Sequence, residues 1–297
     1  MIYKTLYREL CDEGGESVMR CIGLEMKKNL HWPYVLLSVA GIACLGFCGT
    51  VFDPSGAQTT LFGLARQIHE GGIIPDISMS VPVIWQQGLG SWLALFAPLL
   101  VSFGYIVTLS SERQNGQMKF ELIRGGNFRY SVSKAVSGAL FSGVMFLAGY
   151  ALFGLLLKLF FPAFSSFGEE QQWFYLSFYP GNSVILFCIY RLAGAFFFGV
   201  FAGVFGIGVA VFLEDKYMLI CLPFLLNYIY QQVLQKAVAG KYAAGAESAA
   251  WLESFYPASF ANLSASRYWA VPVLVLGLIY CGIVLAFWIR LKRGRVF

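Results

Sequence analysis

The stretch SERQNGQMKFELIRGGNFRYSVSK, residues Ser111–Lys134, is a polar insert between two long apolar runs. Five of its residues are Lys or Arg and two are acidic. Loops with this basic bias lie on the cytoplasmic side of a membrane. Within it, Ser111 and Gln114 have the spacing of a capping box, which predicts that a short helix begins there. Gly125 and Gly126 predict its end, because glycine commonly terminates helices.

The composition around this insert excludes a soluble globular domain. Of the 297 residues, 58% are hydrophobic and 12% are charged, whereas soluble domains carry about 25% charged residues. A spanning helix needs about 20 apolar residues, and open strands find no backbone partners in lipid. We therefore predict an all-α polytopic membrane protein, one transmembrane domain over residues 1–297. Its six predicted spans are about Tyr34–Phe52, Trp92–Leu109, Ala135–Phe160, Ser183–Phe212, Tyr217–Leu234 and Val271–Ile289.

Positive charge is concentrated on one side of the predicted bilayer. Fifteen of the 21 Lys and Arg residues fall in the N-terminal segment, the second and fourth connections and the C-terminal tail. Because cytoplasmic segments are enriched in these residues, we predict that both termini are cytoplasmic.

Two segments outside the spans have patterns of their own. Residues 17–32, SVMRCIGLEMKKNLHW, place apolar residues on one helical face and Arg20, Lys27 and Lys28 on the other. We interpret them as an amphipathic helix in the membrane interface; the alternative is a helix packed on the cytoplasmic ends of the spans. The small-residue-rich external segment 235–270 either partly re-enters the bilayer or forms a surface cap.

The sequence offers no catalytic or metal site. Its two histidines, His31 and His69, fall on opposite sides of the predicted bilayer, so they cannot share a metal ion. No phosphate-binding G-x-x-x-x-G-K-[ST] motif occurs in the sequence. We therefore expect no cofactor on this chain, no enzymatic activity and no nucleic-acid partner; any ATP that energises it must be bound by a second polypeptide.

Several polar or small residues within the spans have two interpretations. Arg191 either reaches the outer interface or lines a pathway for an anionic group. Asn227 and Gln231 either line a pathway or, as we favour, bond two helices together. The Gly199-xxx-Gly203 spacing predicts close helix packing, within or between subunits.

Together these features resemble the membrane subunit of a bacterial type-2 ABC exporter, the ABC type-2 permease family. Glu25-Met26-Lys27-Lys28 before the first span is similar to the entry helix of that family. The pattern from Glu112 through Gly116 and Lys119 to Arg124 resembles the stretch after the second span, although Gly125-Gly126 stands where Pro or Ser often follows. Tyr256–Ser259 resembles the external segment before the last span.

The resemblance implies an exporter in the bacterial cell membrane that moves a hydrophobic or amphipathic substrate outward, such as a peptide, lipid or drug. A separate ABC ATPase subunit would bind ATP and Mg and dock on a coupling helix at residues 111–124. A second permease, a copy of this chain or a different one, would complete the transporter. The residues expected to contact the ATPase are Glu112, Arg113, Gly116, Lys119, Leu122 and Arg124.

Two other classes of function stay open at this point. One is a membrane protein of the same fold that senses a peptide or antibiotic, or gives immunity to it, without net transport. The other is a membrane enzyme, for which the sequence shows no catalytic group.

Overall fold

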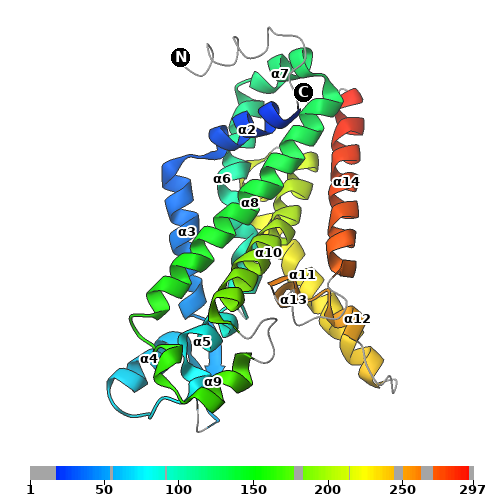
Figure 1. Ribbon diagram of the computed structural model, residues 1–297. Helices are drawn as coiled ribbons and strands as arrows, with labels where there is room; N and C mark the ends of the chain where they lie inside the picture. Colours follow the sequence, from blue (N-terminus) through cyan, green and yellow to red (C-terminus); the bar gives the residue numbers. More distant parts are fainter. Residues whose placement is uncertain are drawn as a thin grey trace.

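The chain folds as a bundle of long helices (Figure 1). The computed structural model describes residues 18–53, 56–90, 92–176, 183–213, 215–243, 250–261 and 270–293. Within these ranges, five helices are long and apolar enough to cross a membrane, or up to six if a bent pair of helices forms one span. That bent pair joins Cys21–Asn29 to Trp32–Phe47 at 75°. The prediction of an all-α polytopic membrane protein is confirmed at this level.

Each long helix covers one of the predicted spans. They are α3 (Trp32–Phe47), α6 (Trp92–Gln114), α8 (Asn127–Leu157), α10 (Val184–Phe212), α11 (Lys216–Ala243) and α14 (Ala270–Lys292). The first predicted span was too long, because Thr50–Phe52 forms a strand. By contrast, α6, α8 and α11 extend past the apolar runs into polar sequence. Glu112 of α6 and Lys134 of α8 are buried there in an ion pair, whereas Lys236 and Lys241 of α11 are exposed.

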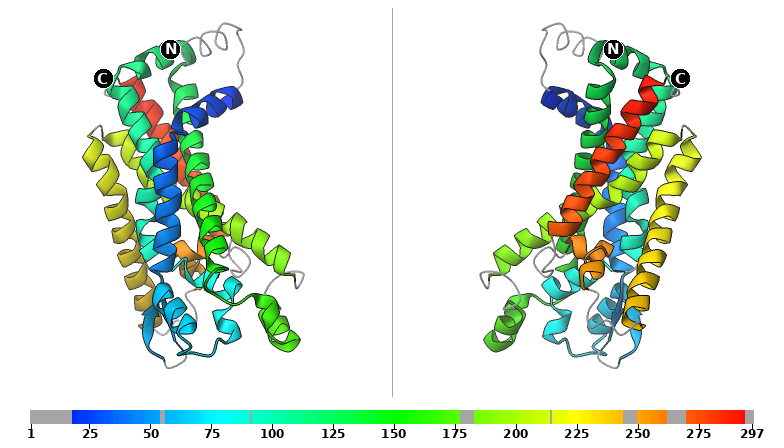
Figure 2. Two further views of the ribbon diagram at one scale, coloured as in Figure 1. Left: turned by 90° about the vertical axis from the view of Figure 1, so that its left-hand side faces the viewer. Right: turned by 90° about the vertical axis from the view of Figure 1, so that its right-hand side faces the viewer.

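Successive long helices run in opposite directions, so the bundle has two distinct ends (Figures 1 and 2). At one end lie the short helices α2 (Val18–Asn29) and α7 (Gln117–Gly125), together with the last turns of α6, α10 and α14. We call this the α7 end. The opposite end is built from short elements: β1 (Thr50–Phe52), β2 (Gln58–Thr60), α4 (Leu61–His69), η1 (Ile77–Met79), α5 (Val81–Gln87), η2 (Phe164–Ser166), α9 (Glu169–Leu176), α12 (Ala250–Glu253) and α13 (Pro257–Ala261).

Among the short elements of the opposite end, the two strands pair with each other and α5 packs firmly on the bundle. Strands β1 and β2 pair antiparallel, with Val51 opposite Thr59. The indole of Trp85 on α5 donates to the carbonyl of Tyr150 on α8 at 3.0 Å, and the Tyr150 hydroxyl donates to the Trp85 carbonyl at 2.6 Å. Their rings also stack, with centroids 5.0 Å apart. Since both groups are buried, this reciprocal pair fixes α5 to the C-terminal part of α8.

The core of the bundle consists of α6, α8 and α10. In the most apolar stretch of α6 and of α10, 61% is buried, compared with 17% for α14. Helices α8 and α10 approach each other closely: a Cβ added at Gly199 would lie 2.6 Å from Cβ of Phe146 and 2.7 Å from the Ser142 carbonyl oxygen. A Cβ at Gly203 would lie 2.6 Å from the Ser142 hydroxyl. The Gly199-xxx-Gly203 pair therefore packs helices within this chain.

The segment 235–270 contributes to the core as well. Phe260 on α13 stacks on Phe201 near the middle of α10, with ring centroids 4.4 Å apart and planes 17° from parallel. Phe260 and Ala261 are both buried. Residues 244–249 and 262–269 of this segment lie outside the described residues. Within the described part, α13 thus packs into the bundle, whereas residues 235–237 and 239–243 are exposed.

The close contact of α8 with α10 makes a stability prediction. Gly199→Ala should lower the free energy of unfolding by about 1–3 kcal/mol, because the new methyl group overpacks the contact with Phe146. Gly277→Ala on the exposed face of α14 is the matched control, since nothing lies within 4 Å of an added Cβ there. Thermal unfolding in detergent would measure both. Equal midpoints for the two variants would show that the α8–α10 contact is looser than described.

Candidate functional site

The short helix of the polar insert is α7, and it begins later than the sequence suggested. Ser111 is not a helix cap: it lies inside α6, which continues to Gln114. Gly116 then turns the chain with a left-handed φ of 67°, and α7 starts at Gln117. The predicted end is confirmed, since α7 stops at Gly125 and Gly126 has a φ of 74°. Both turns need positive φ, which glycine adopts without steric cost.

The inner face of α7 packs on its own chain. Met118 and Leu122 are buried in a cluster with residues of three long helices, Tyr130, Val211, Phe287 and Leu291. Leu122, expected to touch a partner, is therefore turned inward. The apolar residues that face outward are Phe120, 68% exposed, and Ile123, 81% exposed. Lys119 lies on the exposed side as well, and the side chain of Arg124 is outside the described residues.

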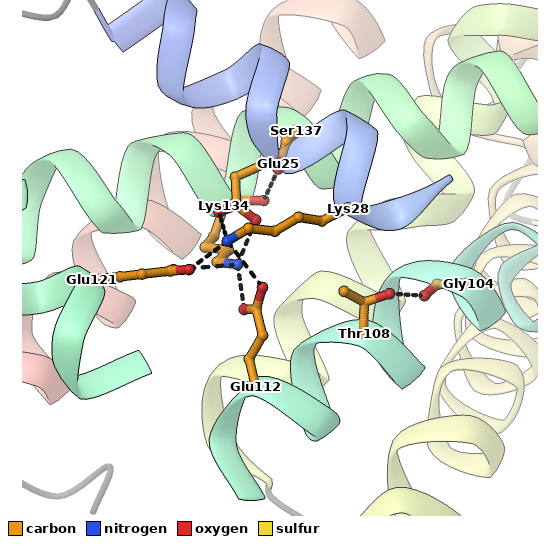
Figure 3. A network of polar contacts seen from close by, with 8 residues as sticks. All are labelled: Glu25, Lys28, Gly104, Thr108, Glu112, Glu121, Lys134 and Ser137. Atoms are coloured by element: carbon orange, nitrogen blue, oxygen red, sulfur yellow. Dashed lines mark hydrogen bonds and ion pairs between the residues drawn. The ribbon is translucent and has the colours of Figure 1, made fainter. Parts of the chain in front are cut away.

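Five charged side chains meet behind α7, and we call them the ion cluster: Glu25, Lys28, Glu112, Glu121 and Lys134 (Figure 3). Glu25 and Lys28 come from α2, Glu112 from α6, Glu121 from α7 and Lys134 from α8. In Figure 3 the two ammonium groups lie at the centre and the three carboxylates surround them. The cluster thus joins α2 to the three consecutive helices α6, α7 and α8.

Each ammonium group is shared among several carboxylates. Lys134 pairs with Glu25 at 2.5 Å, with Glu112, and with Glu121 at 3.8 Å. Lys28 pairs with Glu25 at 3.0 Å, with Glu112 at 3.4 Å, and with Glu121. Every carboxylate of the cluster therefore contacts both ammonium groups.

The cluster is nearly sealed from solvent. The Lys134 side chain is 2% exposed, whereas that of Lys28 is 21% exposed. Three carboxylates face two ammonium groups, so the cluster carries one excess negative charge when all are ionised. Burial raises the pKa of the Glu121 carboxyl, and the neighbouring Glu112 and Glu25 raise it further against the opposing effect of Lys134 and Lys28.

The three carboxylates lie close enough together to resemble a metal site. However, Lys28 and Lys134 already supply the positive charge that a cation would bring. Since both ammonium groups contact all three carboxylates, we interpret the arrangement as a connection between helices instead of a metal centre.

The sequence analysis did not predict this cluster, because it placed the side chains of two of its members on the outside of the chain. Lys28 was predicted on the water-facing side of residues 17–32, and Glu112 in a contact with another protein. The structure instead places both side chains in ion pairs within this chain, which fits the packed-helix alternative for residues 17–32; a contact of Glu112 with another protein stays a prediction. The spacing of Glu25 and Lys28, three residues apart on one helix, was the available signal. Nothing in the sequence indicated Lys134 as their partner.

Arg113 is also turned toward its own chain. Its guanidinium donates to the carbonyls of Leu213 at 2.6 Å and Ala210 at 2.5 Å. Arg290 on α14 donates to the Val211 carbonyl at 2.6 Å. These carbonyls lie at the C-terminal end of α10, where they lack intrahelical partners and a cation is favoured. The ends of α6 and α14 are thereby attached to the end of α10.

The polar residues of the spans lie apart from the ion cluster. Arg191 is 3% exposed, with its guanidinium 5.2 Å from the centre of the Phe187 ring, so protein covers it. The Asn227 amide donates to the Ala94 and Leu95 carbonyls, both at 3.0 Å, and Gln231 donates to Ala94 at 3.4 Å. Pro98 has no N–H for the Ala94 carbonyl. Asn227 therefore replaces a hydrogen bond that the proline removes from α6.

Comparison with protein-family models gives no match to this chain, and comparison with curated proteins gives none either.

Lys134 provides a direct test of the ion cluster. Lys134→Met should lower the free energy of unfolding by about 3–5 kcal/mol, because it leaves buried carboxylates without one of their two ammonium groups. Lys158→Met, an exposed position at the other end of the same helix, should change it by less than about 1 kcal/mol. Thermal unfolding in detergent compares them, and a Lys134→Met midpoint as high as that of the control would contradict the described cluster.

The raised pKa of Glu121 predicts a pH dependence. Its proton is bound more tightly in the folded protein, so its contribution to stability is favourable at low pH and is lost as pH rises through the raised value. The unfolding midpoint of Glu121→Gln minus that of the unchanged protein should therefore be larger at pH 8 than at pH 4. Unfolding midpoints measured across this range give the difference. A constant difference would show that Glu121 titrates normally.

Proposed function

We propose that this chain is the membrane subunit of an ATP-driven exporter of the ABC type-2 permease kind, located in a bacterial cell membrane. The observation that carries the proposal is the placement of α7 across one end of the bundle. Its inner face is held by Met118, Leu122 and the ion cluster, while its outer face leaves Phe120 and Ile123 exposed. A helix held in this way is suited to receive another protein.

The outer surface beside α7 has the character of a protein contact. Phe128, at the start of α8, is exposed near Phe120 and Ile123 in sequence, and Lys119 and Arg129 accompany them. Exposed apolar groups with a polar rim mark interaction sites. In this proposal the partner is an ATPase subunit that carries the ATP and Mg. The contact would involve Phe120, Ile123 and Lys119, in place of the inward-facing Glu112, Arg113 and Leu122.

The charge distribution supports a cytoplasmic α7 end. Exposed cations at this end include Lys27, Lys119, Arg129 and Lys292, and cytoplasmic surfaces are enriched in such residues. Both chain termini would then be cytoplasmic. The exposed Trp32, where α2 joins α3, suits a helix at the level of the lipid headgroups.

The apolar surface at the opposite end supports a second permease subunit. There α9 and the first turns of α10 lean away from the bundle (Figure 2), and Ile185 and Ile189 on α10 are exposed. Pairing two permeases across this region would enclose a path for a hydrophobic or amphipathic substrate. The packing of Phe260 against the middle of α10 supports partial re-entry of the segment 235–270.

A photo-crosslinking residue at position 123 tests the proposal in living cells. Placed at Ile123, it should form an adduct with a protein that contains a phosphate-binding loop, identified by mass spectrometry. The matched control is the same residue at Phe62, which is exposed at the opposite end and should not give that adduct. Adducts only with lipid from position 123, or the same ATPase from both positions, would reject α7 as its docking helix.

The two outward apolar side chains should determine the affinity of this contact. Replacing Phe120 and Ile123 together by Asp should weaken ATPase binding at least about 30-fold, since two buried interface side chains together contribute about 2 kcal/mol or more in such contacts. The unfolding midpoint should stay unchanged, because both residues are exposed in the chain alone. Co-purification with the ATPase that the cross-linking experiment identifies measures the loss of binding. Undiminished recovery would exclude these residues from the contact.

A further inference from the structure

Two contacts of different character hold α7 against the bundle. One is apolar: Met118 and Leu122 pack on side chains of α8, α10 and α14. The other is ionic and runs from Glu121 to Lys28 and Lys134. Apolar packing has no preferred direction and tolerates sliding, whereas charge-assisted hydrogen bonds fix distance and direction. If α7 is displaced, the ionic contact is the one that must either move with it or break.

We propose that the ion cluster is the joint that transmits displacement of α7 into the spanning helices, and that Glu121 is the positioning residue on the α7 side. Glu121 does not contact the docked partner in this arrangement, because its carboxylate faces the interior. The inference rests on the proposed function of α7 as a docking helix, and it adds the route by which docking reaches the membrane.

The route leads to three spanning segments. Lys28 links Glu121 to α2, which joins α3 through a 75° bend, so displacement of α2 changes the angle at which the first span leaves. Glu112 contacts both ammonium groups from the end of α6. Lys134 lies on α8, the helix that packs closely on α10. One set of ion pairs therefore reaches α6 and α8 directly, α3 through α2, and α10 through α8.

The charge balance of the cluster indicates that the Glu121 carboxylate positions α7 instead of stabilising the fold. With three carboxylates for two ammonium groups, the cluster is not neutral, and buried ion pairs often repay no more than their cost of desolvation. Removing the charge of Glu121 leaves two carboxylates for two ammonium groups. The fold should thus keep its stability without this charge, while α7 loses its directional connection to α2. A side chain with only a structural role would behave differently.

The test is Glu121→Gln, with Glu170→Gln at the exposed opposite end as the matched control. Spin-labelled amino acids incorporated at Met19 on α2 and Ile123 on α7, both exposed, report the distance between these helices in the full chain without any partner. We expect a narrow distance distribution in the unchanged protein and in the control, and a broader or shifted one in Glu121→Gln. The unfolding midpoint at pH 7 should not fall.

A second measurement uses the complex with the ATPase captured from position 123. Glu121→Gln should retain that adduct but lower roughly tenfold the stimulation of ATP hydrolysis that the ATPase shows when it binds the permease, within the range usual for coupling between sites. An unchanged α2–α7 distance distribution, or unchanged stimulation of ATP hydrolysis, would contradict the proposal that the ion cluster transmits the displacement of α7. A lowered unfolding midpoint would make Glu121 a structural support and would overturn it also. Absence of any ATPase adduct rejects the proposed function instead, and the distance measurement then still decides whether the joint exists.

Discussion

The α7 end of this protein is organised by the need to neutralise buried charge. Three carboxylates and two ammonium groups are removed from solvent here, and each isolated ion would cost several kcal/mol to bury. They become tolerable only if α2, α6, α7 and α8 bring them together, which the shared contacts of Lys28 and Lys134 achieve. Because a small change in any one helix separates a carboxylate from its ammonium group, the cluster determines the relative position of all four.

The remainder of the bundle depends on close backbone packing. Such packing allows a displacement at the ion cluster to be carried along the helices. Gly199 and Gly203 allow α10 to approach α8 until side chains touch the backbone. Arg113 and Arg290 then attach the ends of α6 and α14 to the free carbonyls of α10. Asn227 restores the hydrogen bond that Pro98 removes from α6. A displacement applied at the end of α6 or α8 is thus carried along packed helices and is not absorbed by a loose core.

Sequence reasoning predicted the long helices because lipid imposes a length and a composition on each of them. It predicted the end of α7 because Gly126 has a backbone conformation that glycine favours. It failed at Ser111, where tertiary contacts let α6 continue through polar residues, and at Lys28 and Glu112, whose charges suggested exposure. A charged residue is buried only when partners from other helices arrive beside it. That information is long-range, and Lys134, 109 positions from Glu25, could not be paired with it from local patterns.

The two faces of α7 separate recognition from transmission. Outward, Phe120 and Ile123 supply apolar area with little geometric demand, which suits binding to a partner surface. Inward, Glu121 supplies directional ion pairs, which suit the transfer of motion but would contribute little to affinity. Since a two-turn helix is unstable in isolation, both faces also depend on the same packing of Met118 and Leu122. If α7 docks a partner as proposed, changes on the outer face would alter which partner binds without altering how its movement reaches α3, α6 and α8, and changes at Glu121 would do the reverse.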